Sequence, residues 1–165
     1  MQIIEVLSAP QITAVEKLAY EIWNEYYPPI IGHDQVDYML ETFQTAKAIL
    51  KQIQQGCRYF ILKENETLFG YMAVEKQDCC VFLSKLYVLK DARKKGYAKE
   101  ALLFLKEYAK EEGLISISLT VNIHNHIAIN TYQKLGFTKQ GSIIQEIGNG
   151  FIMDDYKMEK PVSKL

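Results

Sequence analysis

The chain has 165 residues, a length that suits one domain with a substantial buried core. Its formal net charge is −1, with 19 Lys and Arg against 20 Asp and Glu, so no overall field attracts it to nucleic acid or anionic lipid. No apolar run approaches the roughly 18 residues of a membrane span, and no secretory pattern opens the sequence. Three cysteines indicate no disulfide framework, so we expect a reducing, cytoplasmic location.

The first third of the sequence predicts a short strand followed by helices. A strand is expected over 2–6, and Ser8 with Gln11 fits a capping box at the start of the first helix. A proline pair ends that helix, Asp34 is expected to cap a second helix, and a third lies near 46–55. The apolar residues of the first helix recur at helical spacing: Ile12, Val15, Leu18, Ala19, Ile22 and Tyr26.

The middle of the chain changes to a strand-like period. The segments 57–63, 68–75 and 80–88 are rich in aromatic and aliphatic residues and are separated by polar turns, which predicts an antiparallel meander. The period then becomes helical up to Gly113, and a strictly alternating strand follows at 115–121. A strand, a helix and a strand in this order predict a right-handed crossover between parallel strands.

The last part of the chain predicts a short helix and a hairpin. The helix is expected over 125–136 with Asn125 as its cap, and two strands near 137–145 and 151–159 flank the "GNG" turn at 148–150. The sheet is therefore expected to be mixed, mostly antiparallel, with about six to seven strands and one parallel pair in an α/β (α+β) chain.

The segment "KDARKKGYA" (90–98) places basic side chains at the start of a helix, where the helix dipole disfavours them. The first N–H groups of a helix lack internal partners, so a phosphate bound there gains several hydrogen bonds. Gly96 permits close approach, Ala98 keeps the first turn open, and Arg93 and Lys94 supply charge to the phosphate oxygens. The alternative is a solvated basic loop in which Gly96 is only a turn residue.

Arg93, Gly96 and Ala98 carry a resemblance to a known family. Their spacing matches the Q/R-x-x-G-x-G/A signature of the GCN5-related N-acetyltransferase (GNAT) superfamily. About 30 residues downstream, "NHIAINTYQKLGF" (125–137) is similar to the family's second segment, in the order that the family shows. The resemblance covers roughly residues 57–160, whereas the N-terminal third fits only as a strand followed by helices.

The resemblance implies a GNAT-type three-layer fold with helices on both faces of the sheet and a splayed parallel pair. It implies a single domain over residues 1–165, in which 1–56 form the acceptor side and 57–160 form the acetyl-CoA-binding core. The implied donor is acetyl-CoA, and the implied acceptor is a primary amine that attacks directly in a ternary complex. The pantetheine arm is expected between the strand ending at Val88 and the strand at 115–121.

The resemblance also implies which residues hold acetyl-CoA. Backbone N–H groups of the loop hold the pyrophosphate, and strand-like hydrogen bonds at the end of the preceding strand hold the pantetheine. The amide of Val88 is expected to polarise the thioester carbonyl, and Asn125 to bind the pantetheine. The residues expected to contact acetyl-CoA are Leu86, Tyr87, Val88, Arg93, Lys94, Lys95, Gly96, Tyr97, Ala98, Asn125 and Tyr132.

Tyr132 is expected to stand near the sulfur of acetyl-CoA. Expulsion of a thiolate needs a proton donor, and a phenol with a reference pKa of ~10 can supply one. From the helical pattern alone, Tyr132 shares a face with Ala128 and Leu135 and would be a core residue. The resemblance therefore implies catalytic roles for Tyr132 and Val88.

A general base is not assigned. Some members of the family use a Glu on the strand before the loop, but here that face carries Phe82, Ser84 and Leu86. Ser84 could position a water, while Glu75 and Asp78 are expected to lie too far away. Proton loss through ordered water, or an acceptor of lower pKa, stays open.

The segment 20–35 corresponds to the acceptor side of the family, so polar and aromatic residues there are candidate acceptor contacts. Ordinary core packing and a solvated helix face are the alternatives. No histidine or cysteine spacing indicates a metal site. Together with Ser84, the candidate contacts are Glu25, Tyr26, Tyr27, His33 and Asp34.

The sequence therefore leaves two interpretations of the function open. The first is a cytoplasmic N-acetyltransferase acting on a small-molecule amine, a polyamine or a protein amine; the second is a catalytically weak CoA-binding regulatory module. Nucleic acid and membrane are not expected as partners, because the basic cluster is short and lacks interleaved aromatics. A homodimer through an exposed sheet edge near the C-terminus, the acceptor's identity and the use of other acyl groups stay open.

Overall fold

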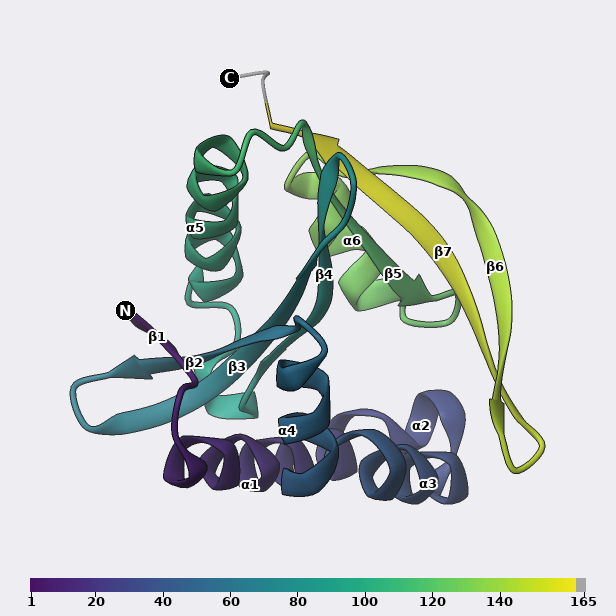
Figure 1. Ribbon diagram of the computed structural model, residues 1–165. Coiled ribbons are helices and arrows are strands. Elements are labelled where there is room, and N and C mark those ends of the chain that lie inside the picture. Colours follow the sequence, from purple (N-terminus) through teal and green to yellow (C-terminus); the bar gives the residue numbers. More distant parts are fainter. Residues whose placement is uncertain (163–165) are drawn as a thin grey trace. The chain divides into compact units, whose positions relative to one another are not determined.

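The computed structural model describes residues 1–162 (Figure 1). The chain divides into two compact units, residues 1–75 with 85–101 and residues 76–84 with those from 102 onward, so that strand β4 belongs to both. The elements, in chain order, are β1 (Gln2–Glu5), α1 (Ala9–Tyr26), α2 (Pro28–Ile31), α3 (His33–Phe43), α4 (Ala46–Gln54), β2 (Arg58–Glu64), β3 (Thr67–Lys76), β4 (Cys80–Val88), the 3-10 turn η1 (Lys90–Ala92), α5 (Tyr97–Glu111), β5 (Ser116–Asn122), α6 (His126–Lys134), β6 (Thr138–Gly148) and β7 (Phe151–Pro161).

The strands follow the order β1-β2-β3-β4-β5-β7-β6 in a seven-stranded sheet. Strand β4 pairs with β5 in parallel, whereas the pairs β1–β2, β2–β3, β5–β7 and β6–β7 are antiparallel. The registered parallel pairs run from Cys80 opposite Ser116 to Leu83 opposite Leu119. The predicted mixed sheet with one parallel pair is confirmed.

Helix α1 begins where the sequence predicts. The side-chain oxygen of Gln11 accepts a hydrogen bond from the backbone N–H of Ser8 at 3.0 Å, as in a capping box. The proline pair does end α1, but Pro28 also opens the four-residue helix α2, which was not predicted. Proline suits the first turn of a helix because the N–H that it lacks would have no helical partner there.

The predicted capping role of Asp34 is wrong. Helix α3 begins at His33, and its N-cap is Gly32, which has a φ of 84°. A left-handed backbone of this kind favours glycine, and Asp34 instead lies in the first turn, where the helix dipole favours a carboxylate. Helix α4 was predicted correctly, and the hydroxyl of Thr45 caps it by accepting from the N–H of Ala48 at 3.1 Å.

A buried chain of hydrogen bonds joins the helices of the first unit to strands β2 and β3. The indole N–H of Trp23 donates to the hydroxyl of Tyr71 at 3.0 Å, and that hydroxyl donates to the side-chain oxygen of Gln44 at 2.6 Å. The amide of Gln44 donates in turn to the hydroxyl of Tyr59 at 3.1 Å. Burial raises the pKa of both tyrosines, so they stay neutral donors. These bonds fix helix α1 against the sheet that precedes β4.

The second unit contains the predicted alternating strand and the closing hairpin. The apolar residues of β5, namely Ile117, Leu119 and Val121, are buried. Strands β6 and β7 are longer than predicted, and Asn149 (φ 52°) and Gly150 (φ 79°) form their turn with the left-handed backbone of a hairpin turn.

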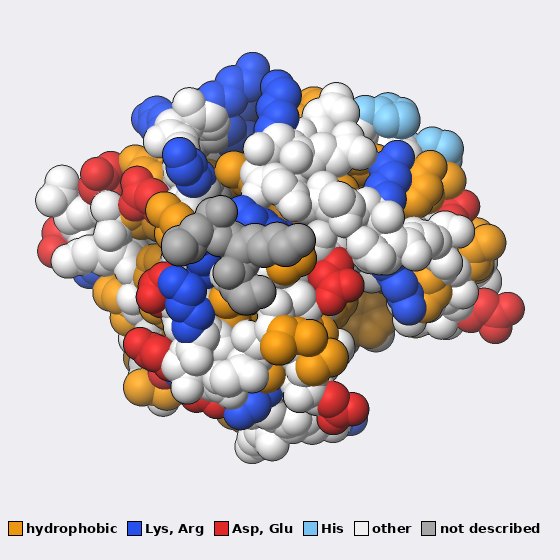
Figure 2. Space-filling model, turned by 90° about the horizontal axis from the view of Figure 1, so that it is seen from above, with side chains coloured by type: hydrophobic (Ala, Val, Ile, Leu, Met, Phe, Trp, Pro, Cys, Tyr) orange, Lys and Arg blue, Asp and Glu red, His pale blue; other side chains and the backbone are white. Residues whose placement is uncertain are grey.

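Basic, acidic and hydrophobic side chains all occur on the molecular face that Figure 2 shows, in keeping with the formal net charge of −1. Within residues 1–162, no helix combines the length and apolar character that crossing a bilayer requires.

Candidate functional site

The end of β4 has one backbone edge on β3 and one edge away from it. The N–H of Leu89 donates to the carbonyl of Phe69 on β3 at 2.8 Å. Backbone groups of successive residues in a strand point to opposite edges, so the N–H of Val88 points away from β3. This is the orientation that the predicted role of Val88 requires. The three predicted residues at this strand end, Leu86, Tyr87 and Val88, are half-buried.

Gly70 on β3 allows the backbones of β3 and β4 to approach closely. A Cβ atom on Gly70 would lie 2.5 Å from the carbonyl oxygen of Tyr87 and 3.3 Å from the Cα of Val88. Real Cβ atoms do not come that close to backbone, so Gly70 sets the path of the strand end that the site uses.

The loop between β4 and α5 is anchored at one end and open at the other. Ala92 in turn η1 packs into an apolar cluster with Leu62 and Phe69. Further along, Lys94 and Gly96 take left-handed backbone angles, φ 63° and 84°, and no atom lies within 4 Å of a Cβ placed on Gly96. The loop is therefore held by Ala92 while its backbone at Gly96 borders open space.

Helix α5 presents its first backbone donors at this loop. The first helical bond runs from the N–H of Glu100 to the carbonyl of Gly96 at 3.1 Å, so the N–H groups of residues 97–99 precede it. Lys94 and Lys95 are exposed beside them. Helix N–H groups at the first turn, an open approach and exposed cationic side chains together fit a diphosphate.

The side chain of Tyr97 fixes the start of α5. Its ring stacks on Phe69 with centroids 4.2 Å apart, and its hydroxyl donates to the carboxylate of Glu64 at 2.6 Å. This hydrogen bond raises the pKa of Tyr97. The ring and hydroxyl therefore serve the fold, and the backbone N–H is the group of Tyr97 that the predicted site uses.

Arg93 is held by three partners within the first unit. Its terminal nitrogens donate to both carboxylate oxygens of Glu25, at 3.1 and 2.6 Å, and its Nε donates to the carbonyl of Val88 at 3.1 Å. Its guanidinium carbon lies 5.0 Å from the ring centroid of Tyr26. The hydrogen bonds from Arg93 hold the pKa of Glu25 below its usual range. Arg93 therefore ties the loop to helix α1 and to the end of β4.

The structure brings two candidate acceptor residues, Tyr26 and Tyr27, beside the end of β4. The hydroxyls of Tyr27 and Tyr87 lie 2.9 Å apart, and the ring of Tyr27 meets that of Tyr26 edge-on at 5.2 Å. Trp23 contacts Tyr87 at 5.3 Å between ring centroids. His33 and Asp34 lie exposed at the start of α3, so the candidate acceptor residues divide into two groups.

The remaining predicted residues belong to the second unit. Ser84 is half-buried on β4. Asn125 is buried and caps α6 as predicted, since its side-chain oxygen accepts from the N–H of Ala128 at 3.3 Å. Tyr132 is half-buried on the same helix, and its ring meets Phe137 edge-on with centroids 5.5 Å apart.

Asp155 on β7 is a titratable residue that the sequence analysis missed. Its side chain is only 2% exposed, and burial together with the neighbouring Asp154 raises its pKa to about 6. The sequence analysis considered acidic residues only on β4 and on the strand and turn before it, and the pairing of β7 with β5 was needed to place this carboxylate in the sheet. The signal in the sequence was the acidic pair in the otherwise strand-like "FIMDDYKME" (151–159).

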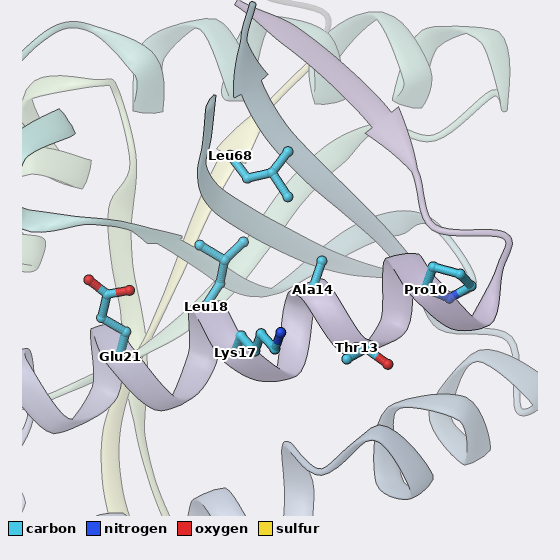
Figure 3. A pocket seen from close by; sticks show the side chains of 7 residues that line it. All are labelled: Pro10, Thr13, Ala14, Lys17, Leu18, Glu21 and Leu68. Carbon is cyan, nitrogen blue, oxygen red and sulfur yellow. The ribbon is translucent and has the colours of Figure 1, made fainter. Parts of the chain in front are cut away.

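Two cavities of the first unit do not coincide with the predicted site. One, of about 340 Å³, lies between α1 and the start of β3 (Figure 3), and its lining residues are Pro10, Thr13, Ala14, Lys17, Leu18, Glu21 and Leu68. The other, of about 660 Å³, lies between α1 and α3 and is lined partly by carboxylates. Neither is lined by a predicted site residue. Within residues 1–162, no three His, Cys, Asp or Glu side chains form a group that could hold a metal ion.

Comparison with known proteins identifies the class. The model of the Acetyltransferase (GNAT) family matches residues 17–137, which include the Gly96 loop and the segment from Asn125 to Phe137. The chain belongs to this family. The class is therefore that of the GNAT acetyltransferases, as the sequence resemblance predicted.

Individual proteins are similar to this chain over its whole length or part of it. GCN5-related N-acetyltransferase 6, chloroplastic, of Arabidopsis thaliana is 28% identical over 118 residues, which are 66% of this chain and 38% of that protein's length. PaiA N-acetyltransferase of Thermoplasma acidophilum, solved with coenzyme A, is 22% identical with a TM-score of 0.80, covering 98% of this chain and 99% of its own. A mutant form of the spermidine N-acetyltransferase SpeG of Vibrio cholerae is 18% identical with a TM-score of 0.69, covering 99% of this chain and 94% of its own.

Proposed function

We propose that this chain is an N-acetyltransferase that moves the acetyl group of acetyl-CoA to a primary amine, which attacks the thioester directly. The observation that carries the proposal is the loop between β4 and α5. In a chain of the GNAT family, it combines the left-handed Gly96, open space beside it and the first N–H groups of α5.

The residues that would hold the donor lie mainly in this loop and at the end of β4. Backbone N–H groups from Gly96 to residue 99 would bind the diphosphate, with Lys94 and Lys95 adding charge. Leu86 and Val88 would bind the pantetheine arm through backbone groups that point away from β3. Arg93, which Glu25 and Val88 already engage, would act by holding the loop in place. Asn125 would also bind the pantetheine.

The chemistry follows from two groups of this chain. The N–H of Val88 would donate to the thioester carbonyl and stabilise the negative charge that forms there during attack. The phenol of Tyr132 would give its proton to the departing thiolate. Acetyl-CoA supplies the thioester that the amine attacks.

The acceptor is proposed as a small-molecule amine, a polyamine or a protein amine. Structural neighbours include a spermidine N-acetyltransferase and a ribosomal-protein-alanine N-acetyltransferase, so the fold serves both kinds of acceptor. Tyr26 and Tyr27, beside the end of β4, are the proposed acceptor contacts that the structure favours over His33 and Asp34. The cytoplasmic location and the homodimer stay predictions.

The test is release of free thiol from acetyl-CoA with a panel of alkylamines, polyamines, amino sugars and peptide N-termini. We expect turnover with at least one class of amine and micromolar to millimolar apparent KM values. Calorimetry measures acetyl-CoA binding in parallel. Binding without thiol release for any amine would favour the regulatory module instead, and absence of binding would contradict both functions.

A further inference from the structure

Phe69 on β3 interacts with three successive segments that are proposed to bind the donor. Its backbone carbonyl accepts a hydrogen bond from the N–H of Leu89, just after the end of β4, at 2.8 Å. Its side chain is 5% exposed and belongs to one apolar cluster with Ala92 of turn η1. Its ring stacks on that of Tyr97, the first residue of α5, with centroids 4.2 Å apart. Phe69 therefore joins the end of β4, the turn and the start of α5.

Phe69 occupies an irregular position in its strand. Leu62 on β2 pairs with Gly70 on β3. The next residue of β2, Lys63, already pairs with Leu68, so the register skips Phe69. Phe69 is thus the extra residue of a β-bulge, a feature that changes the direction of a side chain and is frequent beside active sites. Paired residues on both sides hold the bulge in place.

The two groups proposed to anchor the donor belong to segments that Phe69 joins. The N–H of Val88, at the end of β4, is proposed to bind the thioester carbonyl, and the N–H groups proposed to bind the diphosphate begin at Gly96. These two residues are eight positions apart in the sequence. A loop of this length allows many separations of its ends. The separation of the two anchors therefore depends on residues outside the loop that hold both ends.

Other contacts of the loop do not replace those of Phe69. The hydroxyl of Tyr97 donates to the carboxylate of Glu64, the last residue of β2, at 2.6 Å, so the β2–β3 hairpin holds the start of α5 twice. The hydrogen bonds of Arg93 run instead to Val88 and to Glu25 on α1. They fix the loop to β4 and to α1, whereas the hairpin fixes the start of α5.

We propose that Phe69 is a positioning residue for donor binding, which sets the separation between the N–H of Val88 and the first N–H groups of α5. One molecule of acetyl-CoA can then reach both anchors. This inference rests on the proposed function, and it assigns to Phe69 no contact with the donor. A ligand that reaches two anchors at once binds far more tightly than either of its halves, because the second contact forms at a high effective concentration.

The experiment compares acetyl-CoA, without amine, with the two halves of the molecule. ADP carries the diphosphate without the pantetheine arm, and S-acetylpantetheine carries the thioester without the diphosphate. In Phe69→Leu, we expect the calorimetric Kd of acetyl-CoA to rise about tenfold or more. The Kd of each half, from NMR titration, should stay within about twofold of wild type, because each anchor remains intact and only their separation changes.

The control is Phe60→Leu. Phe60 is 3% exposed on β2, where its ring lies 5.3 Å from the guanidinium carbon of Arg58. Both substitutions remove a buried aromatic ring from the first unit, so both should lower Tm. Phe60→Leu should keep the Kd of acetyl-CoA within about twofold of wild type, which separates a change of position from a loss of stability.

Tyr97→Leu removes the other ring of the stack from a half-buried position, and it also serves if Phe69→Leu does not fold. We expect the same rise in the Kd of acetyl-CoA and the same unchanged halves. The double variant should bind acetyl-CoA within about twofold of either single variant, because both substitutions remove one shared contact.

A wild-type Kd of acetyl-CoA in both single variants, or a rise that ADP or S-acetylpantetheine shares in full, would overturn the inference and leave the transferase intact. A wild-type protein that binds acetyl-CoA but neither half would also overturn it, since no separate anchors would then exist. Absence of acetyl-CoA binding by the wild type would instead contradict the proposed function, and this inference with it.

Discussion

The guanidinium group of Arg93 binds both carboxylate oxygens of Glu25, at 3.1 and 2.6 Å, across 68 positions of sequence. One of these residues lies in the loop proposed to bind the diphosphate, and the other is the penultimate residue of α1. Glu25 was expected to contact the acceptor, but its carboxylate faces the donor loop. Its proposed role is therefore to position Arg93.

Glu25→Gln tests that role. Loss of the charge removes the paired hydrogen bonds that hold Arg93, so we expect KM for acetyl-CoA to rise several-fold, while KM for the amine changes little. The free energy of unfolding should fall by less than about 1 kcal/mol, because ion pairs that are partly exposed contribute little. Glu21→Gln, one turn earlier on α1, is the control, and an equal effect of both changes would contradict the assignment.

Gly96→Ala tests the loop. Both Gly96 (φ 84°) and Gly113 (φ 70°) have left-handed backbones and open space around a Cβ, so alanine at either should cost about 1–2 kcal/mol of stability. Only Gly96→Ala should weaken acetyl-CoA binding, measured by calorimetry, because Gly113 lies after the far end of α5. Unchanged affinity in Gly96→Ala would argue against a diphosphate at this turn.

Gly70→Ala tests whether the end of β4 positions the acyl donor. Its methyl group would push against the carbonyl of Tyr87 at 2.5 Å, so the end of β4 must move or β3 must shift. We expect a lower Tm in thermal denaturation and an acetyl-CoA KM that rises by more than the loss of stability explains. Wild-type kinetics in a destabilised Gly70→Ala protein would show that the strand end does not position the donor.

Tyr132→Phe tests the proton donor. The variant keeps the ring contact with Phe137, so the fold should be preserved while kcat falls by at least about tenfold. KM for acetyl-CoA should change little. The control is Tyr156→Phe, whose ring packs under Lys139 on the hairpin and has no proposed role. Full activity of Tyr132→Phe would remove the assignment.

Asp155→Asn should change the free energy of unfolding, and in the direction opposite to that of most substitutions. Folding raises the pKa of Asp155 from its usual 3.8 to about 6, so the native state holds its proton more tightly than the unfolded chain does. Stability therefore falls as pH rises from about 4 to 6 and stays lower above that range. At pH 7 the variant should be more stable than wild type by about 1–3 kcal/mol, and at pH 4 the difference should nearly vanish.

Thermal denaturation of the wild type, of Asp155→Asn and of the control Asp154→Asn, each at pH 4 and pH 7, measures this effect. A structural role for Asp155 would give the opposite result, because loss of a stabilising carboxylate lowers Tm.

Local patterns in the sequence predicted most helices and strands, because hydrophobic period and capping chemistry are properties of neighbouring residues. Asn125 and the strand at 115–121 are examples in which side-chain chemistry and alternation were sufficient. The cap of α3 was wrong because the backbone angle of Gly32 decided the start of the helix. The hydrophobic periodicity of the sequence does not reveal that backbone angle.

The site was only partly predictable for a different reason. The motif around Gly96 is contiguous in sequence, so it could be read directly. The partner of Arg93 lies on α1, far away in the sequence, and the surroundings of the buried Asp155 depend on the register between β5 and β7. Tertiary packing determines which residue of one element lies beside which residue of another. From the sequence alone, many other acidic residues could have occupied the positions of Glu25 and Asp155.

Trp23 is the single tryptophan of the chain, and its indole hydrogen-bonds Tyr71 while its ring rests 5.3 Å from that of Tyr87. Trp23 is thus an intrinsic fluorescence probe next to the segment where the donor would bind. Its ultraviolet emission should shift or quench on titration with coenzyme A, so occupancy can be followed without any dye, radiolabel or coupled assay.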